Sequence, residues 1–197
     1  AGGRGVTWSS DNTYMAVGDT ATPYIIIYKR AGDVFTKLAN PSILPANTIN
    51  GVSWSSDGTY LALTSSSSPF IIIYKRSGDV FIKLADPASL PPAQGNSCAF
   101  NFDDSQLIVG HASTPYITIY NRSGDTFTKI NDPEVLPPST AETVDTNSDG
   151  TRVAIGSQSA PYMTIYSVTG NTYTALDEVE TPIPGAALGV RYSSGDS

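Results

Sequence analysis

The sequence predicts an all-β protein built from four copies of one four-stranded sheet. Two observations support this prediction. A segment at residues 69–84 recurs almost unchanged 46 residues earlier and 46 residues later, and it recurs once more in degraded form from Pro161. The chain is also 40% hydrophobic and only 15% charged, with 17 Gly and 14 Pro, which is typical of short strands joined by tight turns.

The repeat divides residues 1–197 into four units, 1–46, 47–92, 93–138 and 139–184, followed by residues 185–197. A single repeat of this kind cannot bury its apolar faces alone, so neighbouring repeats stack and share a continuous core. We therefore expect one domain rather than several.

The first strand of the second unit is predicted at residues 51–56, around Trp54. A turn follows it in every unit, and the turn positions are Asp11-Asn12, Asp57-Gly58, Asp103-Asp104 and Asp149-Gly150. The second residue of each pair tolerates a left-handed backbone, as a two-residue hairpin loop requires. The second strand is predicted at residues 60–63, with positions 61 and 63 on one face.

A proline precedes the third strand in every unit (Pro23, Pro69, Pro115 and Pro161). Proline cannot donate to a ladder, so it marks the start of that strand. The strand is apolar on both faces, with Ile73 on one side and Tyr74 on the other, which favours a sheet between two other layers. Position 72 changes to Thr118 and Thr164 in later units, and we expect it to be less critical.

A Gly-Asp or Gly-Asn turn, at 78–79 in the second unit, closes a hairpin to the fourth strand, which ends at Pro87. Four short antiparallel strands in each unit are typical of a propeller blade. The predicted fold is an all-β propeller of four four-stranded blades of ~46 residues, plus one surplus strand.

The segment from Trp54 to Ala62 resembles the Phe-Ser-Pro-Asp-Gly segment of WD40-type repeats. The Gly-His and Trp-Asp signatures are absent, so the resemblance is to the divergent WD40-like repeats of phage and bacterial proteins. It covers the whole chain. It implies a propeller toroid with a recognition or scaffold role, and it implies no catalytic residue.

The surplus copy repeats the first strand at Gly189, Val190, Arg191, Tyr192 and Ser193. Three interpretations stay open. The chain is cut from a longer repeat array, the strand pairs with a neighbouring molecule to build an oligomer or filament, or it begins a blade that another chain completes.

Composition excludes two kinds of partner. The net charge of −7 lacks the basic footprint of nucleic-acid binding, and the longest aliphatic runs are three isoleucines, too short for membrane insertion. The one cysteine, Cys98, takes the place of Val52 and is expected to be a small buried hydrophobe.

Candidate site residues are few. Asp145, Asn147 and Asp149 match the opening of a calcium loop, although the twelfth position is Gly156 rather than Glu. Calcium is the only cofactor that the sequence suggests. His111, expected in an exposed loop, and Tyr14 and Tyr60, beside turns where a sugar ring could stack, are candidate ligand contacts. Residues that break the repeat are the better functional candidates, namely His111, Glu142, Asp145, Arg152 and Gln158.

The expected function is a non-catalytic structural or interaction module of a virion or extracellular appendage, with self-assembly by strand exchange. The alternative is a carbohydrate- or receptor-binding, lectin-like propeller that recognises a glycan or another protein. A hydrolase resembling bacterial lactonase propellers ranks last, because the expected inner-strand positions are mostly Ser, Thr and aromatic. We therefore expect that the protein is not an enzyme.

Overall fold

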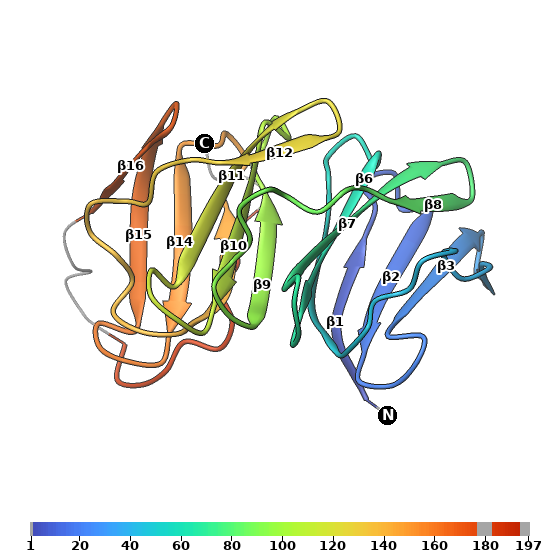
Figure 1. Cartoon of the computed structure of the whole chain (residues 1–197), viewed down its shortest axis with the longest axis horizontal. Helices are drawn as coiled ribbons and strands as arrows, with labels where there is room; N and C mark the ends of the chain where they lie inside the picture. The colour runs from blue at the N-terminus through green and yellow to red at the C-terminus, as the bar shows by residue number, and fades with distance from the viewer. Residues whose placement is uncertain (1, 177–182, 194–197) are drawn as a thin grey trace.

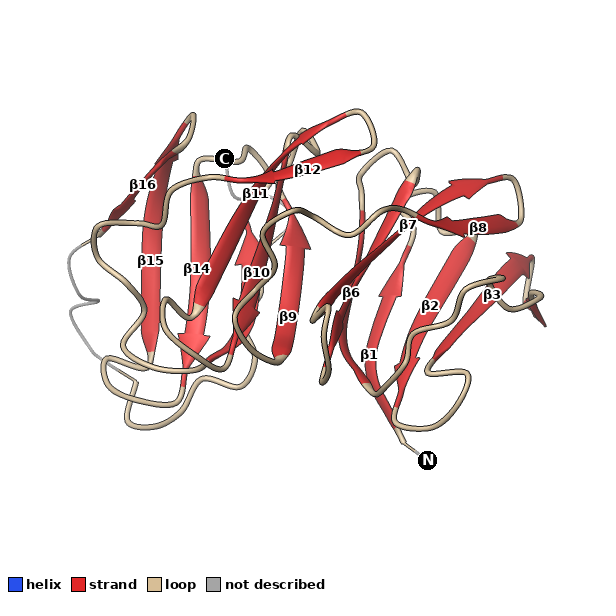
Figure 2. Ribbon diagram, viewed as in Figure 1, coloured by secondary structure: helices blue, strands red, loops and turns tan. Residues whose placement is uncertain are grey.

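The computed structural model describes residues 2–176 and 183–193. The end of the fourth unit (177–182), residues 194–197 of the surplus copy and residue 1 lie outside this description. Four antiparallel sheets make up the fold, so the predicted all-β propeller of four four-stranded blades is confirmed (Figure 2). Over the described ranges, no helix is long and apolar enough to cross a membrane.

Each sheet contains four consecutive strands in chain order. The strands of the first two sheets are β1 (Gly3–Trp8), β2 (Tyr14–Asp19), β3 (Ile25–Ala31), β4 (Val34–Lys37), β5 (Ile49–Trp54), β6 (Tyr60–Ser65), β7 (Ile71–Ser77) and β8 (Val80–Lys83). Those of the last two are β9 (Gly95–Phe100), β10 (Gln106–His111), β11 (Ile117–Ser123), β12 (Thr126–Lys129), β13 (Ala141–Thr146), β14 (Arg152–Ser157), β15 (Met163–Thr169) and β16 (Thr172–Ala175).

The first strands of the four sheets, β1, β5, β9 and β13, lie innermost and pack side by side. The sheets follow one another from the blue N-terminal sheet to the orange C-terminal sheet (Figure 1). Contacts join the first sheet to the second, the second to the third and the third to the fourth. Within the described residues no comparable contact joins the fourth sheet to the first, so the blades form an arc around their axis.

Apolar side chains fill the space between consecutive sheets. Ile27 of the first sheet packs in one cluster with Tyr74 and Phe81 of the second, and Tyr74 is fully buried. The same pattern recurs between the second and third sheets and between the third and fourth. This confirms the prediction for the third strands of the second and third sheets, which are covered on both faces, with isoleucine and tyrosine on opposite sides.

The first sheet has one face that no described sheet covers. Trp8 and Phe35 are 39% and 44% exposed there, whereas their equivalents in the second unit, Trp54 and Phe81, are 7% and 3% exposed. Identical side chains are therefore core in one unit and surface in another, because burial comes from the neighbouring sheet.

The second strand of one sheet approaches the innermost strand of the next closely because a small residue faces a larger one. A Cβ on Gly18 would lie 2.6 Å from Cγ2 of Ile49, and a Cβ on Gly95 would lie 2.8 Å from Cβ of Thr64. The two contacts occupy the same place in successive interfaces, with the large and small residues exchanged between the sheets. Neither glycine has room for a side chain.

The expected two-residue loop between the first two strands is wrong. β5 ends at Trp54 and β6 begins at Tyr60, so five residues intervene. The first strand of the second unit also begins and ends earlier than expected, at Ile49–Trp54 rather than at 51–56. The Ser55 hydroxyl donates to Asp57 at 2.6 Å and accepts from the Tyr60 N–H at 2.8 Å, which closes the longer turn. The left-handed backbone was correctly predicted, with φ of 65° at Gly58.

The proline-rich connectors are fastened by the buried tyrosines of the third strands. The Tyr74 hydroxyl donates to the Ile43 carbonyl at 2.7 Å, and Tyr120 and Tyr166 make the equivalent bonds to Ser89 and Val135 at 2.8 Å. Each sheet thus binds the segment that leads to its own first strand. Because each hydroxyl has a partner, the buried tyrosines carry no unpaired donor.

The two tryptophans allow the contribution of sheet stacking to be measured. We expect Trp54→Ala to lower the free energy of unfolding by about 3–5 kcal/mol, because it empties a packed interface. Trp8→Ala, the matched control on the uncovered face, should cost far less. Urea denaturation of both variants checks this, and equal losses would contradict the difference in burial.

Candidate functional site

The second residue of each innermost strand faces the axis. These residues are Arg4, Asn50, Asn96 and Glu142. All four line one cavity of about 480 Å³, which Gln94, Ala112, Thr140 and Gln158 complete. A second hollow of about 380 Å³ shares the four axial residues and extends along the inner strands.

Two carboxamides in this axial cavity link neighbouring blades. Nδ2 of Asn50 donates to the Gly95 carbonyl at 2.8 Å, and Nδ2 of Asn96 donates to the Ala141 carbonyl at 3.0 Å. Each amide therefore bridges to the next inner strand, which holds the axial residues in place.

The remaining two residues carry the charge. Oε1 of Glu142 accepts a hydrogen bond of 2.5 Å from Nε2 of Gln158, which orients the carboxylate. Across the described residues, the Arg4 guanidinium forms no ion pair. The cavity thus combines a cation for an anionic group, amides for hydroxyl groups, and a carboxylate that can accept a proton.

The surplus segment packs on the fourth sheet, beside the axial cavity. The Ala187 N–H donates to the Ser157 carbonyl at 3.1 Å, and the Tyr192 N–H donates to Oδ2 of Asp145 at 2.7 Å. Ala187 approaches Gly156 as Ile49 approaches Gly18, so the segment lies where the next innermost strand would lie. Whether residues 189–193 mediate assembly stays a prediction.

His111 does not lie in an exposed loop, and that expectation is wrong. It ends β10 and is fully buried, with Nε2 3.0 Å from Oγ1 of Thr118. Nδ1 has no hydrogen-bond partner among the described residues. Burial lowers the pKa of His111 below its ordinary value. Thr118 is fully buried as well, so this position is not the less critical one that we expected.

Tyr14 and Tyr60 are not open stacking platforms. Each is only 4% exposed, and each hydroxyl donates to an aspartate of the next sheet, Asp79 or Asp125, at 2.6 Å. A guanidinium carbon lies 4.7 Å from the ring centroid of Tyr14 and another lies 4.9 Å from that of Tyr60. Their role as ligand contacts stays a prediction.

The three residues of the predicted calcium loop are only partly brought together. Nδ2 of Asn147 donates to Asp149 at 2.7 Å, but Asp145 faces the axial hollow, 3.6 Å from Arg191. Over the ranges described, no group of three or more His, Cys, Asp or Glu side chains could hold a metal ion. Calcium binding stays a prediction.

Only part of the axial cavity was predicted from the sequence. Glu142 and Gln158 were among the residues that break the repeat, but Arg4, Asn50 and Asn96 were missed. The available signal was a single repeat position that reads Arg, Asn, Asn and Glu in successive units. Cys98 is buried as predicted, and burial raises the pKa of its thiol to about 12.

No protein-family model and no curated protein matches the chain. Solved structures do match. A proposed 6-phosphogluconolactonase from Bacteroides fragilis NCTC 9343 aligns with a TM-score of 0.74 at 12% identity over 89% of this chain and 54% of that one. A second, from Bacteroides uniformis ATCC 8492, aligns with a TM-score of 0.73 at 12% identity over the same shares.

Hydrazine synthase from Kuenenia stuttgartiensis aligns with a TM-score of 0.68 at 10% identity, over 89% of this chain and 49% of that one. The chain thus spans about half the length of these neighbours. Identities this low show the propeller fold alone.

The predicted function of a non-catalytic structural module of a virion or appendage is contradicted. The structural neighbours are enzyme-like propellers, and nothing supports a virion role or self-assembly. The error arose because the residues that face the axis were not identified. Inner-strand positions expected to be Ser, Thr or aromatic include Arg4 and Glu142, which converge on one cavity.

His111 should make stability depend on pH. The unfolded chain binds a proton as the pH falls below about 6.5, whereas the buried imidazole stays neutral, so stability is lost from that pH downward. We expect the loss to reach at most about 1.4 kcal/mol per pH unit. His111→Ser, which copies Ser65 and Ser157, should flatten this dependence between about pH 7 and 5 in urea denaturation. An unchanged slope would contradict the assignment.

Proposed function

We propose that the axial cavity is the substrate site of an enzyme-like propeller that hydrolyses a sugar lactone bearing an anionic group. The observation that supports this proposal is the convergence of Arg4, Asn50, Asn96 and Glu142 on one cavity of about 480 Å³. The two Bacteroides neighbours are described as 6-phosphogluconolactonases, which suggests the substrate class.

Each axial residue has a role in this proposal. Arg4 binds the phosphate or carboxylate of the substrate, since a guanidinium pairs well with such groups. Asn50 and Asn96 donate through Nδ2, while Oδ1 of Asn50 accepts from the Ser66 hydroxyl at 3.5 Å and Oδ1 of Asn96 accepts from Nε2 of Gln94 at 3.0 Å. Each Oδ1 has a second lone pair, which can accept from a substrate hydroxyl. These contacts fix the lactone ring against Glu142.

Glu142 acts as the general base. Its carboxylate, oriented by Gln158, takes a proton from a water molecule whose oxygen attacks the lactone carbonyl carbon. The ring carbon–oxygen bond then breaks, the ring oxygen takes up a proton, and the products are a free carboxylic acid and a hydroxyl group. No covalent enzyme intermediate is required.

We further propose that the repeats are of the divergent WD40-like kind found in phage and bacterial proteins. The Trp54 to Ala62 segment supports this finer assignment, while the propeller arrangement itself is shown by the four sheets.

The test is lactone hydrolysis by the purified chain. We expect it to hydrolyse 6-phosphogluconolactone faster than the uncatalysed reaction. The rate is measured as the release of acid under mildly acidic conditions. Glu142→Gln should lower the rate constant by about 10²-fold or more, because the base is lost. Arg4→Gln should raise the KM for the phosphorylated lactone and leave that for unphosphorylated gluconolactone nearly unchanged.

Matched controls are Glu134→Gln and Arg30→Gln, which remove the same groups from exposed positions outside the axial cavity. They should leave the rates unchanged. Absence of turnover by the purified chain, or equal turnover by the Glu142→Gln variant, would overturn the proposal.

A further inference from the structure

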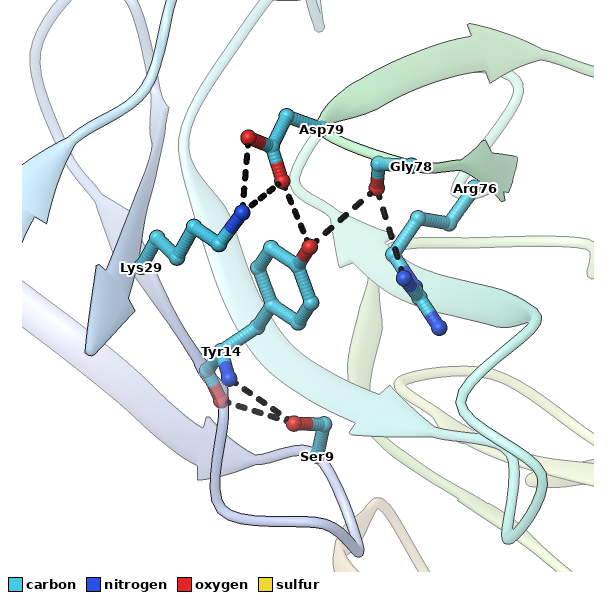
Figure 3. A network of polar contacts seen from close by, with 6 residues as sticks. All are labelled: Ser9, Tyr14, Lys29, Arg76, Gly78 and Asp79. Carbon is cyan, nitrogen blue, oxygen red and sulfur yellow. Dashed lines mark hydrogen bonds and ion pairs between the residues drawn. The ribbon is translucent and has the colours of Figure 1, made fainter. Parts of the chain in front are cut away.

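The first two sheets are joined by a charged network around Tyr14. Its hydroxyl donates to Asp79, which also pairs with Nζ of Lys29 at 2.9 Å (Figure 3). Arg76 lies over the Tyr14 ring, and its Nε and Nη1 donate to the carbonyls of Gly58 and Gly78 at 2.7 and 3.3 Å. An arginine thus fills the space between tyrosine and backbone.

The second interface repeats this network. Tyr60 donates to Asp125, which pairs with Lys75 at 2.9 Å. Arg122 lies over the Tyr60 ring and donates through Nε to the Asp104 carbonyl at 2.6 Å. Two independent copies therefore place a guanidinium at the same point.

The third interface replaces four members of the network at once. The tyrosine, lysine, aspartate and arginine become Gln106, Asn121, Asn171 and Val168. Nε2 of Gln106 lies 3.0 Å from Oδ1 of Asn121 and 3.1 Å from Oδ1 of Asn171, and Oε1 accepts from Tyr173 at 2.7 Å. The amide takes over the polar contacts of the tyrosine hydroxyl, but Val168 cannot supply those of a guanidinium.

A cavity of about 520 Å³ lies at this point. Gln106, Val168, Gly150 and Gly170 line it. Gly150 and Gly170 are the equivalents of Gly58 and Gly78, whose carbonyls accept from Arg76 in the first interface. The cavity therefore occupies the place where the other two interfaces hold an arginine side chain.

The cavity also keeps the negative charge that accompanies this arginine. Asp103 is equivalent to Asp11, whose pKa is lowered by hydrogen bonds from Ser9 and Thr13 and, to a smaller extent, by the guanidinium of Arg76. Asp103 and Asp149 line the cavity at the third interface. Hydrogen bonds from Ser105 and Thr151 lower their pKa values, so both carboxyl groups are ionised at neutral pH.

Relative to the first interface, the third has lost two cations and one carboxylate, so it is one unit more negative. Arg122 also borders the cavity, but its guanidinium is held at the second interface.

We propose that the cavity between the third and fourth sheets binds a guanidinium group of a ligand, such as an arginine side chain. The planar group would lie against Gln106, donate to the carbonyls of Gly150 and Gly170, and lie close to Asp103 and Asp149. One positive charge restores the balance of the first interface. This site is independent of the axial cavity and of its proposed reaction.

The test compares three neutral-capped amino acids as probes of the full chain. The probes are N-acetyl-arginine amide, its neutral isostere N-acetyl-citrulline amide, and N-acetyl-lysine amide. Each is titrated into the protein while NMR follows the side-chain amide signals of Gln106, Asn121 and Asn171. We expect saturable shifts with the arginine probe, and binding roughly tenfold weaker with citrulline, because the charge-assisted hydrogen bonds are lost.

Val168→Arg restores the residue found in the other two units and should fill the cavity itself. We expect this variant to abolish the shifts, and Asp103→Asn to weaken binding several-fold. Asp33→Asn, in an exposed turn of the first sheet, is the matched control and should change nothing. Free methylguanidinium distinguishes recognition of the group alone from recognition of an arginine residue.

Three outcomes would overturn the proposal. They are the absence of saturable shifts with the arginine probe, equal affinity for citrulline, and undiminished binding to a folded Val168→Arg variant. If that variant does not fold, the Asp103→Asn result decides, because it removes a carboxylate without adding volume.

Discussion

The fold depends on one constraint, which is that each sheet exposes two apolar faces and the neighbouring sheet must cover them. Tyr74 is fully buried because the first sheet lies against it, not because its own strand shelters it. Burial of apolar surface is the main driving force of folding, so a blade alone would not be stable. The close approach of the innermost strands follows from the same requirement, and it brings the axial residues together.

The fold was predictable because its signal is repeated. Ile73 and Tyr74 recur in four units, and a strand that is apolar on both faces indicates a covered sheet. Which strand of each sheet lies at the axis was not predictable, because the first strand mixes polar and apolar residues and could lie at the axis or at the rim. The axial cavity also escaped prediction, since Arg4 and Glu142 belong to different units and meet only once four sheets are arranged. His111 was misplaced because its partner, Thr118, lies on the next strand.

Chemistry concentrates where the repetition fails. At the axis, one position changes from Arg to Asn to Glu while the strands around it keep their geometry. At the third interface, Gln106 and Val168 replace a tyrosine and an arginine without disturbing the sheets on either side. A repeated scaffold tolerates such changes because its stability is spread over many equivalent contacts, so single positions can vary and acquire separate roles.

The small and large residues at which the second strand of one sheet meets the first strand of the next have a further consequence for the order of the units. Gly18 faces Ile49, but Thr64 faces Gly95. A shuffled chain that placed Thr64 opposite Ile49 would force two branched side chains into space for one, and Gly18 opposite Gly95 would leave a void. The second unit is therefore not interchangeable with the others at this contact, whereas the first and third units both present a glycine, Gly18 and Gly110, to the next sheet.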